Sequence, residues 1–347
     1  MDAQTLEKCK MKILIIQTAF IGDVILTLPL AQEVKSFFPS PEIDFIVIPS
    51  AQNLLENNPA ISQTIVFDKR KKDSGVGGTI RVSKKIREQE YDTAFIPHRS
   101  LRSALLAKLA NIKERVGFST SAGKFLFTKN VHYEQSLHEI ERNLSLLHPF
   151  GYSKREKVFP ILYPSENDKT IVNDFLTSGA SKIIAIAPGT VWNTKRWLKG
   201  NFIKLGKLIA SAGYSVVLVG GKDDNVLCEE IKTKIDSSFV INSAGQFTLL
   251  QSAEILRRCS LLVCNDSAPL HLAVAMKTPV VSIFGATVPR FGFYPYGEND
   301  IVIEDVNLAC RPCSIHGGDK CPLETFDCMK NISAGMVFEK VKEKLQL

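Results

Sequence analysis

The sequence predicts an α/β protein that contains two doubly wound units. Apolar segments of strand length alternate along the chain with segments in which apolar residues recur at helical spacing. The strand-like segments are continuously apolar, as expected for parallel strands that helices cover on both faces. The chain has 347 residues, of which 45% are hydrophobic, and this is enough for two ordinary cores.

Both halves of the chain carry this alternation. In the first half, strands are expected at 12–17, 43–48, 63–67 and 92–96, and helices at 22–37, 78–90, 100–110 and 136–148. In the second half, strands are expected at 182–187, 215–220, 260–264 and 279–284, and helices at 200–212, 223–235, 248–258 and 268–276.

The alternation stops in the sequence FGYSKREKVFPILYPSEND, which begins at Phe150 and contains two prolines and a cluster of charges. We therefore predict domains at 11–152 and 166–347, joined by a linker at 153–165. Two such domains would leave a cleft lined by strand carboxyl ends, where ligands usually bind. One large sheet is the alternative.

The start of the chain shows no export or membrane segment. No apolar run reaches the ~18 residues that a spanning helix needs, and residues 1–10 lack an apolar signal core. We expect residues 1–10 to be a poorly ordered extension, with Met11 as an alternative start, and we expect a protein that is not secreted.

The positive charge of the chain is concentrated in one region. The formal net charge is +7, but residues 69–129 hold 15 Lys and Arg against 5 Asp and Glu, a local charge of +10. Such a region favours an anionic partner, which could be nucleic acid, an acidic lipid surface or a phosphorylated substrate. A solvated basic face is the alternative.

Small and polar residues follow three strands of the second half, in the sequences PGTVWNTKRW (188–197), GGKDD (220–224) and NDSAPLH (265–271). A helix start presents unpaired backbone N–H groups, and the helix dipole favours an anion there. Each loop alone fits ordinary capping, with Ser267 or Asp266 as the cap. Together with Lys195 and Arg196, the three loops indicate a ligand that carries phosphate. The P-loop and GxGxxG patterns are absent, which disfavours P-loop NTPases and nicotinamide-binding domains.

A single carboxylate stands at the first strand-to-helix junction, in the sequence TAFIGDVILTLP (18–29). Asp23 has two interpretations. A carboxylate in the first turn of a helix is stabilising in itself. A carboxylate at the mouth of a strand can also act as a general base.

Five sequence motifs resemble, in order and spacing, those of the bacterial ADP-heptose:lipopolysaccharide heptosyltransferase family. They are TAFIGDVILTLPLAQEVKSFFP (18–39), HRSLRSALLAKLANIKERVGF (98–118), HEIERNL (138–144), PGTVWNTKRWLKGNF (188–202) and NDSAPLHLAVAMKTPVVSIFGATVPRFGFYPYG (265–297). The resemblance spans almost all of residues 11–347. It implies the GT-B fold, with two Rossmann-like domains and the active site between them.

The resemblance also implies an activity. It points to an inverting, metal-independent transfer of L-glycero-D-manno-heptose from ADP-heptose to the inner core of lipopolysaccharide, without a cofactor. The GDVILTLP sequence and the cysteine-bearing tail look closer to the branch that adds the second heptose. A related GT-B transferase that uses another nucleotide sugar, or adds a different heptose, is the alternative.

The resemblance assigns roles to individual residues. Asp23 matches the proposed general base. The expected nucleotide-sugar contacts are Thr190, Thr194, Lys195, Arg196, Asp223, Asp266, Ser267, Ala268 and His271, with Asp224 as the alternative to Asp223 for the ribose hydroxyls. The expected acceptor contacts in the N-terminal domain are Arg70, Arg99, Arg102 and Arg115. We also expect a mobile loop at 69–80, and a structural role for Arg142.

The basic region then has a candidate partner, the lipid A–Kdo acceptor with or without a first heptose. Its carboxylates and phosphates suit guanidinium groups. We expect a cytoplasmic enzyme that is peripheral on the inner face of the cytoplasmic membrane. A nucleic-acid-binding protein is the alternative class, which the lack of aromatic interleaving and of any recognition motif disfavours.

Four of the eight cysteines cluster near the C-terminus, at Cys310, Cys313, Cys321 and Cys328. A CxxC pair with two more cysteines close by is a candidate structural zinc site. The spacing lacks a second CxxC, so free or partly paired thiols are the alternative. We expect no metal in the chemistry itself.

Overall fold

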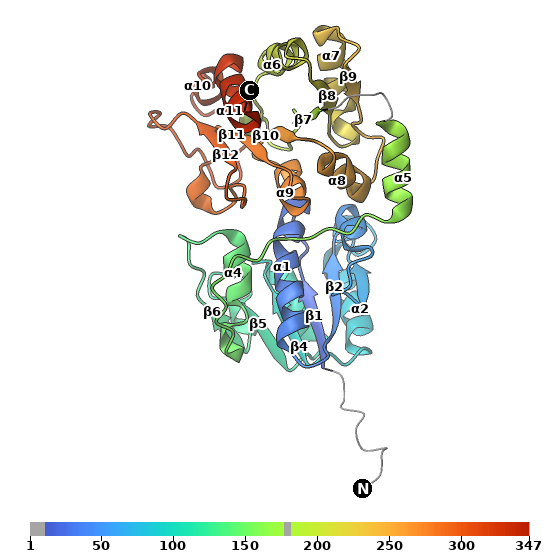
Figure 1. The fold of residues 1–347 in the computed structure, drawn as a ribbon. Helices are drawn as coiled ribbons and strands as arrows, with labels where there is room; N and C mark the ends of the chain where they lie inside the picture. The colour runs from blue at the N-terminus through green and yellow to red at the C-terminus, as the bar shows by residue number, and fades with distance from the viewer. Residues whose placement is uncertain (1–10, 177–181, 347) are drawn as a thin grey trace. The chain divides into compact units, whose positions relative to one another are not determined.

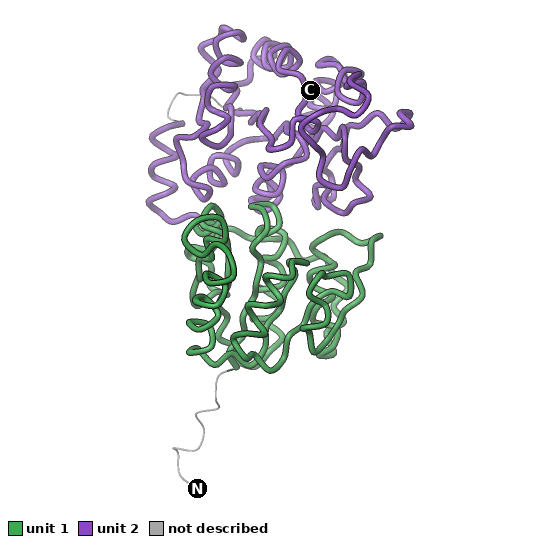
Figure 2. The backbone as a smooth tube through the Cα atoms, turned by 180° about the vertical axis from the view of Figure 1, so that it is seen from behind, with its two compact units in different colours: residues 1–163 green, residues 164–347 purple. Residues whose placement is uncertain are grey.

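The structure is a computed structural model that describes residues 11–176 and 182–346 (Figure 1). Residues 1–10, which we expected to form an extension, lie outside the described part. The chain divides between Tyr163 and Pro164 into two compact units (Figure 2). This division falls inside the predicted linker at 153–165.

In the described residues, the first unit contains a six-stranded parallel sheet with the order β3-β2-β1-β4-β5-β6. Its strands are β1 (Lys12–Ile16), β2 (Glu42–Val47), β3 (Gln63–Val66), β4 (Thr93–Ile96), β5 (Glu114–Phe118) and β6 (Lys129–Val131). Its α-helices are α1 (Ile21–Phe37), α2 (Gly75–Arg87), α3 (Leu101–Leu109) and α4 (Glu139–Ser145).

The second unit has a sheet of the same kind, with the order β12-β11-β10-β7-β8-β9 in its described part. Its strands are β7 (Ile183–Ala187), β8 (Ser215–Leu218), β9 (Val240–Asn242), β10 (Leu261–Asn265), β11 (Val280–Phe284) and β12 (Ile301–Glu304). Its α-helices are α5 (Glu166–Phe175), α6 (Lys199–Ser211), α7 (Asn225–Ile235), α8 (Leu249–Arg257), α9 (Ala268–Ala275), α10 (Asp327–Lys330) and α11 (Ala334–Leu345).

Two separate sheets confirm the predicted α/β class and exclude the single large sheet. Within each unit the strand order is that of a Rossmann-like fold. The order reverses between β1 and β4 in the first unit and between β7 and β10 in the second. Ligands of such sheets bind at the carboxyl ends of the strands beside this reversal.

Helices cover both faces of the first sheet because its central strands are apolar on both sides. Leu14 and Ile16 pack in one cluster with residues of α2 and α3. Ile13 and Ile15 alternate with them along the strand, so they point to the opposite face, and they are equally buried. On the helical layers, α1 packs with α4 and α2 packs with α3.

The eight predicted strands are all present, but four others were missed. β6 and β9 have only three residues each, which is too short for a periodicity argument. β5 begins with Glu114 and Arg115, so its sequence does not look like a continuously apolar strand. β12 is a four-residue strand at the edge of its sheet. The helices α5, α10 and α11 were also missed.

Residues 69–80, expected as a mobile loop, are in part helical. The helix α2 begins at Gly75 rather than at residue 78. Asp73 anchors the preceding turn, since its carboxylate accepts the Asp68 N–H at 3.1 Å and pairs with Arg81 at 2.8 Å.

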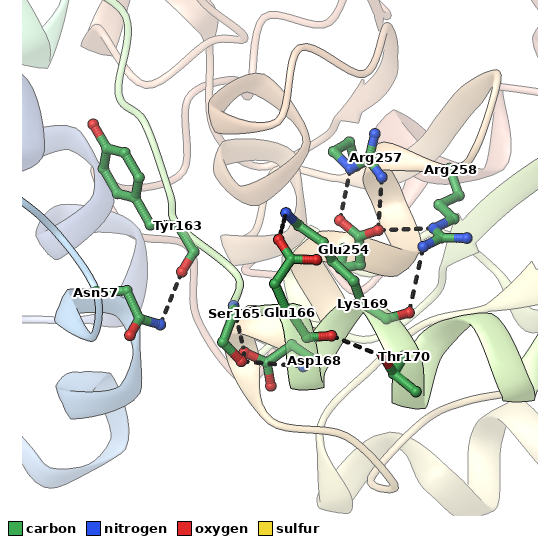
Figure 3. Close-up of polar contacts among 10 residues, drawn as sticks. All are labelled: Asn57, Tyr163, Ser165, Glu166, Asp168, Lys169, Thr170, Glu254, Arg257 and Arg258. Carbon is green, nitrogen blue, oxygen red and sulfur yellow. Dashed lines mark hydrogen bonds and ion pairs between the residues drawn. The ribbon is translucent and has the colours of Figure 1, made fainter.

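The last residues before the division are bound to the first unit. Tyr152 and Lys154 both bind the Glu33 carboxylate of α1, at 3.0 Å each. Asn57 donates to the carbonyl of Tyr163 at 3.1 Å (Figure 3).

The first residues after the division belong to the second unit. Ser165 caps α5 through the Asp168 N–H at 3.1 Å, and Arg258, the residue after α8, donates to the Lys169 carbonyl at 3.3 Å (Figure 3). Among the described residues, no helix is long and apolar enough to span a membrane.

Candidate functional site

Asp23 lies in the first turn of α1, just beyond the carboxyl end of β1. Its Oδ2 accepts the backbone N–H of Phe20 at 3.2 Å, and its carbonyl accepts the Thr27 hydroxyl at 2.7 Å. The hydrogen bond from the Phe20 N–H therefore supports the capping interpretation. It does not exclude a catalytic role, because an ionised carboxylate can accept several hydrogen bonds at once.

Lys69 follows β3 and lies close enough to Asp23 to respond to its charge. Its ammonium donates to the carbonyl of Thr18, and its own carbonyl accepts from Arg102 at 3.1 Å. Burial, followed by the charges of Arg70 and Arg102, lowers the pKa of Lys69, while the charge of Asp23 raises it. Arg70, the residue selected from the sequence, is exposed. Residues 69–72 are four consecutive cationic residues, and residue type alone does not show which of their side chains points inward.

His98 bridges the point at which the strand order reverses. It follows β4, and its Nδ1 lies 3.0 Å from the hydroxyl of Thr18, which follows β1, and 2.9 Å from that of Ser103. Burial, with smaller effects from Lys69 and Arg99, lowers the pKa of His98 to about 4. The imidazole is therefore neutral at pH 7 and holds the two strand ends together. The sequence did not predict this link for His98, because an isolated histidine forms no recognisable pattern with its neighbours in the sequence.

The HEIERNL motif forms a buried polar cluster at the start of α4. Glu139 Oε2 accepts the Tyr133 hydroxyl at 2.7 Å and pairs with Arg142 at 3.0 Å. The guanidinium of Arg142 is 2% exposed and also donates to the carbonyls of Glu134 and Gln135, which confirms its structural role. Burial raises the pKa of Glu139, and the charge of Asp23 adds to this effect.

Two of the expected acceptor arginines lie at the carboxyl ends of the strands. The guanidinium of Arg99 stacks 4.3 Å from the centre of the Tyr133 ring, and Arg102 holds the Lys69 carbonyl. Arg115 is placed differently. It lies at the amino end of β5, the opposite edge of a parallel sheet, and donates to the carbonyls of Leu126, Ile112 and Lys113. These contacts give it a structural role, and the acceptor interpretation has no support there.

In the second unit, Asn265 joins the two strand ends beside the reversal. Its amide donates to the Pro188 carbonyl at 2.9 Å, and its Oδ1 accepts the Trp197 N–H at 2.9 Å. Both ends of the 188–197 loop are thus tied to the end of β10. The Trp197 indole is buried and donates to the Ile332 carbonyl at 2.8 Å, which fixes the loop against the core.

Lys195 and Asp266 meet at this edge as a largely buried ion pair. Their closest atoms are 2.6 Å apart, the lysine side chain is 14% exposed, and the carboxylate also accepts the Thr287 hydroxyl at 2.7 Å. His271 of α9 is buried close by. Burial, with the charge of Lys195 as the second cause, lowers its pKa to about 3, so it is neutral.

The expected contacts on the 188–197 loop differ in what they bind. Arg196 Nη2 donates to the Thr190 carbonyl at 2.8 Å, while its buried Nε has no hydrogen-bond partner among the described residues. Thr194 is buried, and its hydroxyl accepts the Gly318 N–H at 2.7 Å. Its side chain is therefore engaged with the cysteine-bearing segment, so we interpret Thr194 as a support of the loop.

No side chain of the described residues caps the start of α9. Ser267 occupies the N-cap position before Ala268, but its side chain caps no N–H group of the helix. Its hydroxyl lies 3.5 Å from the Gly189 carbonyl instead. The first helical N–H groups therefore retain the partial positive charge of an uncapped helix start. Asp266, the other candidate cap, is engaged with Lys195 and Thr287.

Asp224, rather than Asp223, turns toward the strand ends. Its Oδ2 accepts the Gly221 N–H at 2.9 Å, and a methyl group added to Gly189 would lie 2.0 Å from its Oδ1. Asp223 is exposed. The sequence did not show which of the two aspartates faces the site, because adjacent acidic residues in a loop have no periodicity from which a direction could be inferred.

The cysteines of the C-terminal segment are free thiols among the described residues. Cys310, Cys313 and Cys321 are partly exposed, and Cys328 is buried at the start of α10. No three Cys, His, Asp or Glu side chains of the described part are arranged to hold a metal ion as they stand.

The chain is similar to known glycosyltransferases over most of its length. Residues 79–320 match the profile of glycosyltransferase family 9 (heptosyltransferase). Lipopolysaccharide heptosyltransferase 2 of Salmonella typhimurium is 28% identical over 294 residues, which cover 81% of this chain and 84% of that protein.

Two solved structures share the fold. The ADP-heptose lipopolysaccharide heptosyltransferase II of Escherichia coli has a TM-score of 0.82 at 24% identity and covers 97% of this chain and 99% of its own. A family 9 glycosyltransferase of Veillonella parvula has a TM-score of 0.87 at 23% identity and covers 97% of each chain. The fold is thus the GT-B architecture of two Rossmann-like units, and the match over residues 79–320 shows that the chain belongs to glycosyltransferase family 9, the heptosyltransferases.

Proposed function

We propose that this heptosyltransferase moves L-glycero-D-manno-heptose from ADP-heptose to the inner core of lipopolysaccharide, with inversion at the anomeric carbon. The observation that carries the proposal is that each unit of this family 9 chain has its own polar site at its strand ends. One unit presents a carboxylate beside cations at its strand ends, and the other presents an anion-binding edge.

Asp23 serves as the general base in this proposal. It takes the proton of the acceptor hydroxyl while that oxygen attacks the anomeric carbon and the bond to the diphosphate breaks. Lys69 and Glu139 both lie close enough to Asp23 to respond to its charge: that charge opposes the lowering of the Lys69 pKa by burial, and it adds to the raising of the Glu139 pKa by burial.

The second unit holds the donor. Lys195, the Nε of Arg196 and the uncapped start of α9 stabilise the negative charge that develops on the departing diphosphate. Two cations and a helix start provide this stabilisation without a metal ion in the chemistry. Asp224 is the better-placed candidate for the ribose hydroxyls, because its carboxylate lies against the loops after β7 and β8.

The acceptor binds the first unit through Arg99, Arg102 and the exposed Arg70. Guanidinium groups suit the carboxylates and phosphates of a lipid A–Kdo acceptor. The excess charge of residues 69–129 would draw the enzyme to the inner face of the cytoplasmic membrane. Two relatives named lipopolysaccharide heptosyltransferase 2, from Salmonella typhimurium and Escherichia coli, favour the second-heptose step.

The experiment that tests this function measures ADP release from ADP-heptose with defined truncated acceptors. We expect release only with an acceptor that already carries one heptose. Release with the heptose-free acceptor alone would assign the first step instead. Release from other nucleotide sugars but not from ADP-heptose would favour the alternative, a related GT-B transferase with another donor.

A further inference from the structure

Tyr133 lies in the segment between β6 and α4, and its side chain is fixed at both ends. It is 5% exposed, and its ring packs edge to face on Phe118 at the end of β5, with the ring centres 5.0 Å apart. Its hydroxyl donates to Glu139 Oε2 at 2.7 Å and accepts from Arg142 at 2.8 Å. The direction of the buried ring is therefore determined by the protein itself.

The fixed ring holds the guanidinium of Arg99, which comes from a different strand end. Arg99 follows β4, and its Cζ lies 4.3 Å from the centre of the Tyr133 ring, within the range of a cation–π contact. Its carbonyl accepts the N–H of Ala122, in the turn after β5, at 3.2 Å. Arg99 is thus held at its backbone and at the end of its side chain.

The contact with the ring leaves the hydrogen-bond donors of Arg99 available. Within the part of the chain that the structure describes, its guanidinium makes no hydrogen bond or ion pair. Arg102, by contrast, donates to the carbonyl of Lys69 at 3.1 Å. An aromatic ring covers the face of a guanidinium, whereas the five N–H donors lie in its plane. The donors of the half-buried Arg99 therefore remain available at the edge of the group.

A guanidinium held in this way suits an oxyanion. Its planar fork binds a carboxylate or a phosphate through two parallel N–H donors. A side chain that a ring already holds loses less conformational entropy when the ligand binds. The strand β4 is the neighbour of β1 in the sheet, and Asp23 lies just beyond β1. An oxyanion bound to Arg99 would therefore lie on the same edge of the sheet as the candidate base.

We propose that Tyr133 is a positioning residue of the acceptor site, whose ring holds Arg99 in the direction that binds a carboxylate or phosphate of the acceptor. Tyr133 acts through Arg99, since its own side chain is buried. The buried pair of Glu139 and Arg142 then has a purpose, because it fixes the hydroxyl end of the ring. This inference deepens the proposed function and rests on it, because the acceptor is the source of the oxyanion.

Two substitutions at Tyr133 separate the ring from the hydroxyl. Tyr133→Leu removes both, and we expect the acceptor KM to rise about five- to twentyfold, with kcat and ADP affinity near wild type. Tyr133→Phe keeps the ring, so its acceptor KM should stay within about twofold of the wild-type value. An unchanged KM in Tyr133→Leu overturns the proposal. An equal rise in Tyr133→Phe overturns it too, because the effect would then come from the hydroxyl.

Tyr152→Leu is the matched control for lost stability. Tyr152 belongs to the same unit and is similarly buried, its hydroxyl donates to Glu33 at 3.0 Å, and its ring packs on Phe37. We expect this variant to lose Tm to a similar extent as Tyr133→Leu and to keep the wild-type acceptor KM. A KM rise as large as that of Tyr133→Leu would reveal a general effect of destabilisation and overturn the proposal.

A double-mutant cycle tests whether Tyr133 acts through Arg99. Arg99→Gln should raise the acceptor KM by itself, and adding Tyr133→Leu should raise it no further. Effects that multiply would show two independent contributions and overturn the proposal. A dephosphorylated acceptor identifies the oxyanion: a persistent effect of Arg99→Gln supports a carboxylate, and a lost effect supports a phosphate.

Calorimetry with the acceptor alone separates this inference from the proposed function. Without a donor, we expect Tyr133→Leu to weaken acceptor binding by the same factor by which it raises KM. If this weakening is found but the wild type releases no ADP from ADP-heptose, the role of Tyr133 stands and the proposed function is contradicted. If the wild type releases ADP and Tyr133→Leu binds the acceptor equally well, the inference alone is overturned.

Discussion

At the scale of single residues, the structure distinguishes side chains that the sequence could not. Lys69 turns inward and Arg70 outward, and Asp224 lies against the strand-end loops while Asp223 is exposed. Neighbours of one charge type differ only in their direction relative to the sheet. That direction depends on how the turn after each strand closes, and turn geometry is weakly encoded in residue type.

Arg102 tests the acceptor site. We expect Arg102→Glu to raise the acceptor KM about tenfold or more, because it removes a guanidinium from the strand-end cluster and adds a repelling carboxylate. The KM for ADP-heptose should stay near the wild-type value. Lys108→Glu is the control, since it makes the same charge change at the exposed far end of α3. An unchanged acceptor KM in Arg102→Glu would refute the acceptor role of this residue.

Lys195 tests the donor site. Lys195→Met removes a phosphate contact and leaves the buried Asp266 carboxylate without its cation. We expect ADP affinity to fall about 10- to 100-fold, together with a loss of about 3 kcal/mol in the free energy of unfolding. The control is Lys199→Met, which breaks an ion pair with Glu230 whose two side chains are about half exposed. Wild-type ADP affinity in Lys195→Met would contradict the assignment.

At the scale of elements, the sequence predicted the central strands well and the sheet edges poorly. β1, β4, β7 and β10 are apolar because helices cover both faces, and that burial is written directly in the residue types. Edge strands such as β6 and β9 are short and half-solvated, so the sequence does not distinguish them from loops. The link across the reversal, made by His98, depends on tertiary pairing of β1 with β4 and has no local signature.

The His98 bridge makes stability depend on pH. Because burial holds the folded pKa of His98 near 4 and the unfolded value is about 6.5, the unfolded state binds the extra proton between these values. The free energy of unfolding should therefore fall as the pH drops from about 6.5 to about 4, by up to about 1.4 kcal/mol per pH unit from this group.

The comparison with His98→Asn isolates this effect, since His271 titrates in both proteins. Urea unfolding at several pH values should show the wild type losing its advantage over the variant as the pH falls through this window. A difference that stays constant from pH 7 to pH 4 would show that His98 is not held neutral by the fold.

At the scale of the whole molecule, the described part of the chain contains two copies of one topology. Each sheet reverses its strand order once, and the candidate functional side chains lie near each reversal: Asp23, Lys69 and His98 in one unit, Lys195 and Asp266 in the other. The alternation of strands and helices predicted this duplication. The proposed roles of the two units, acceptor binding in the first and donor binding in the second, rest on the resemblance of the motifs, because a Rossmann-like topology by itself does not determine the chemistry.

The central claim is that Asp23 is the general base, and the variant Asp23→Asn tests it most directly. Asparagine keeps an oxygen that can accept the Phe20 N–H, so the cap is retained while the base is lost. The measurement is acceptor-dependent ADP release, with Tm and ADP affinity as controls. The account predicts a kcat lower by about 10²- to 10⁴-fold, with Tm and ADP affinity close to wild type. A kcat close to wild type would contradict the account, and Asp23 would then be a helix cap alone.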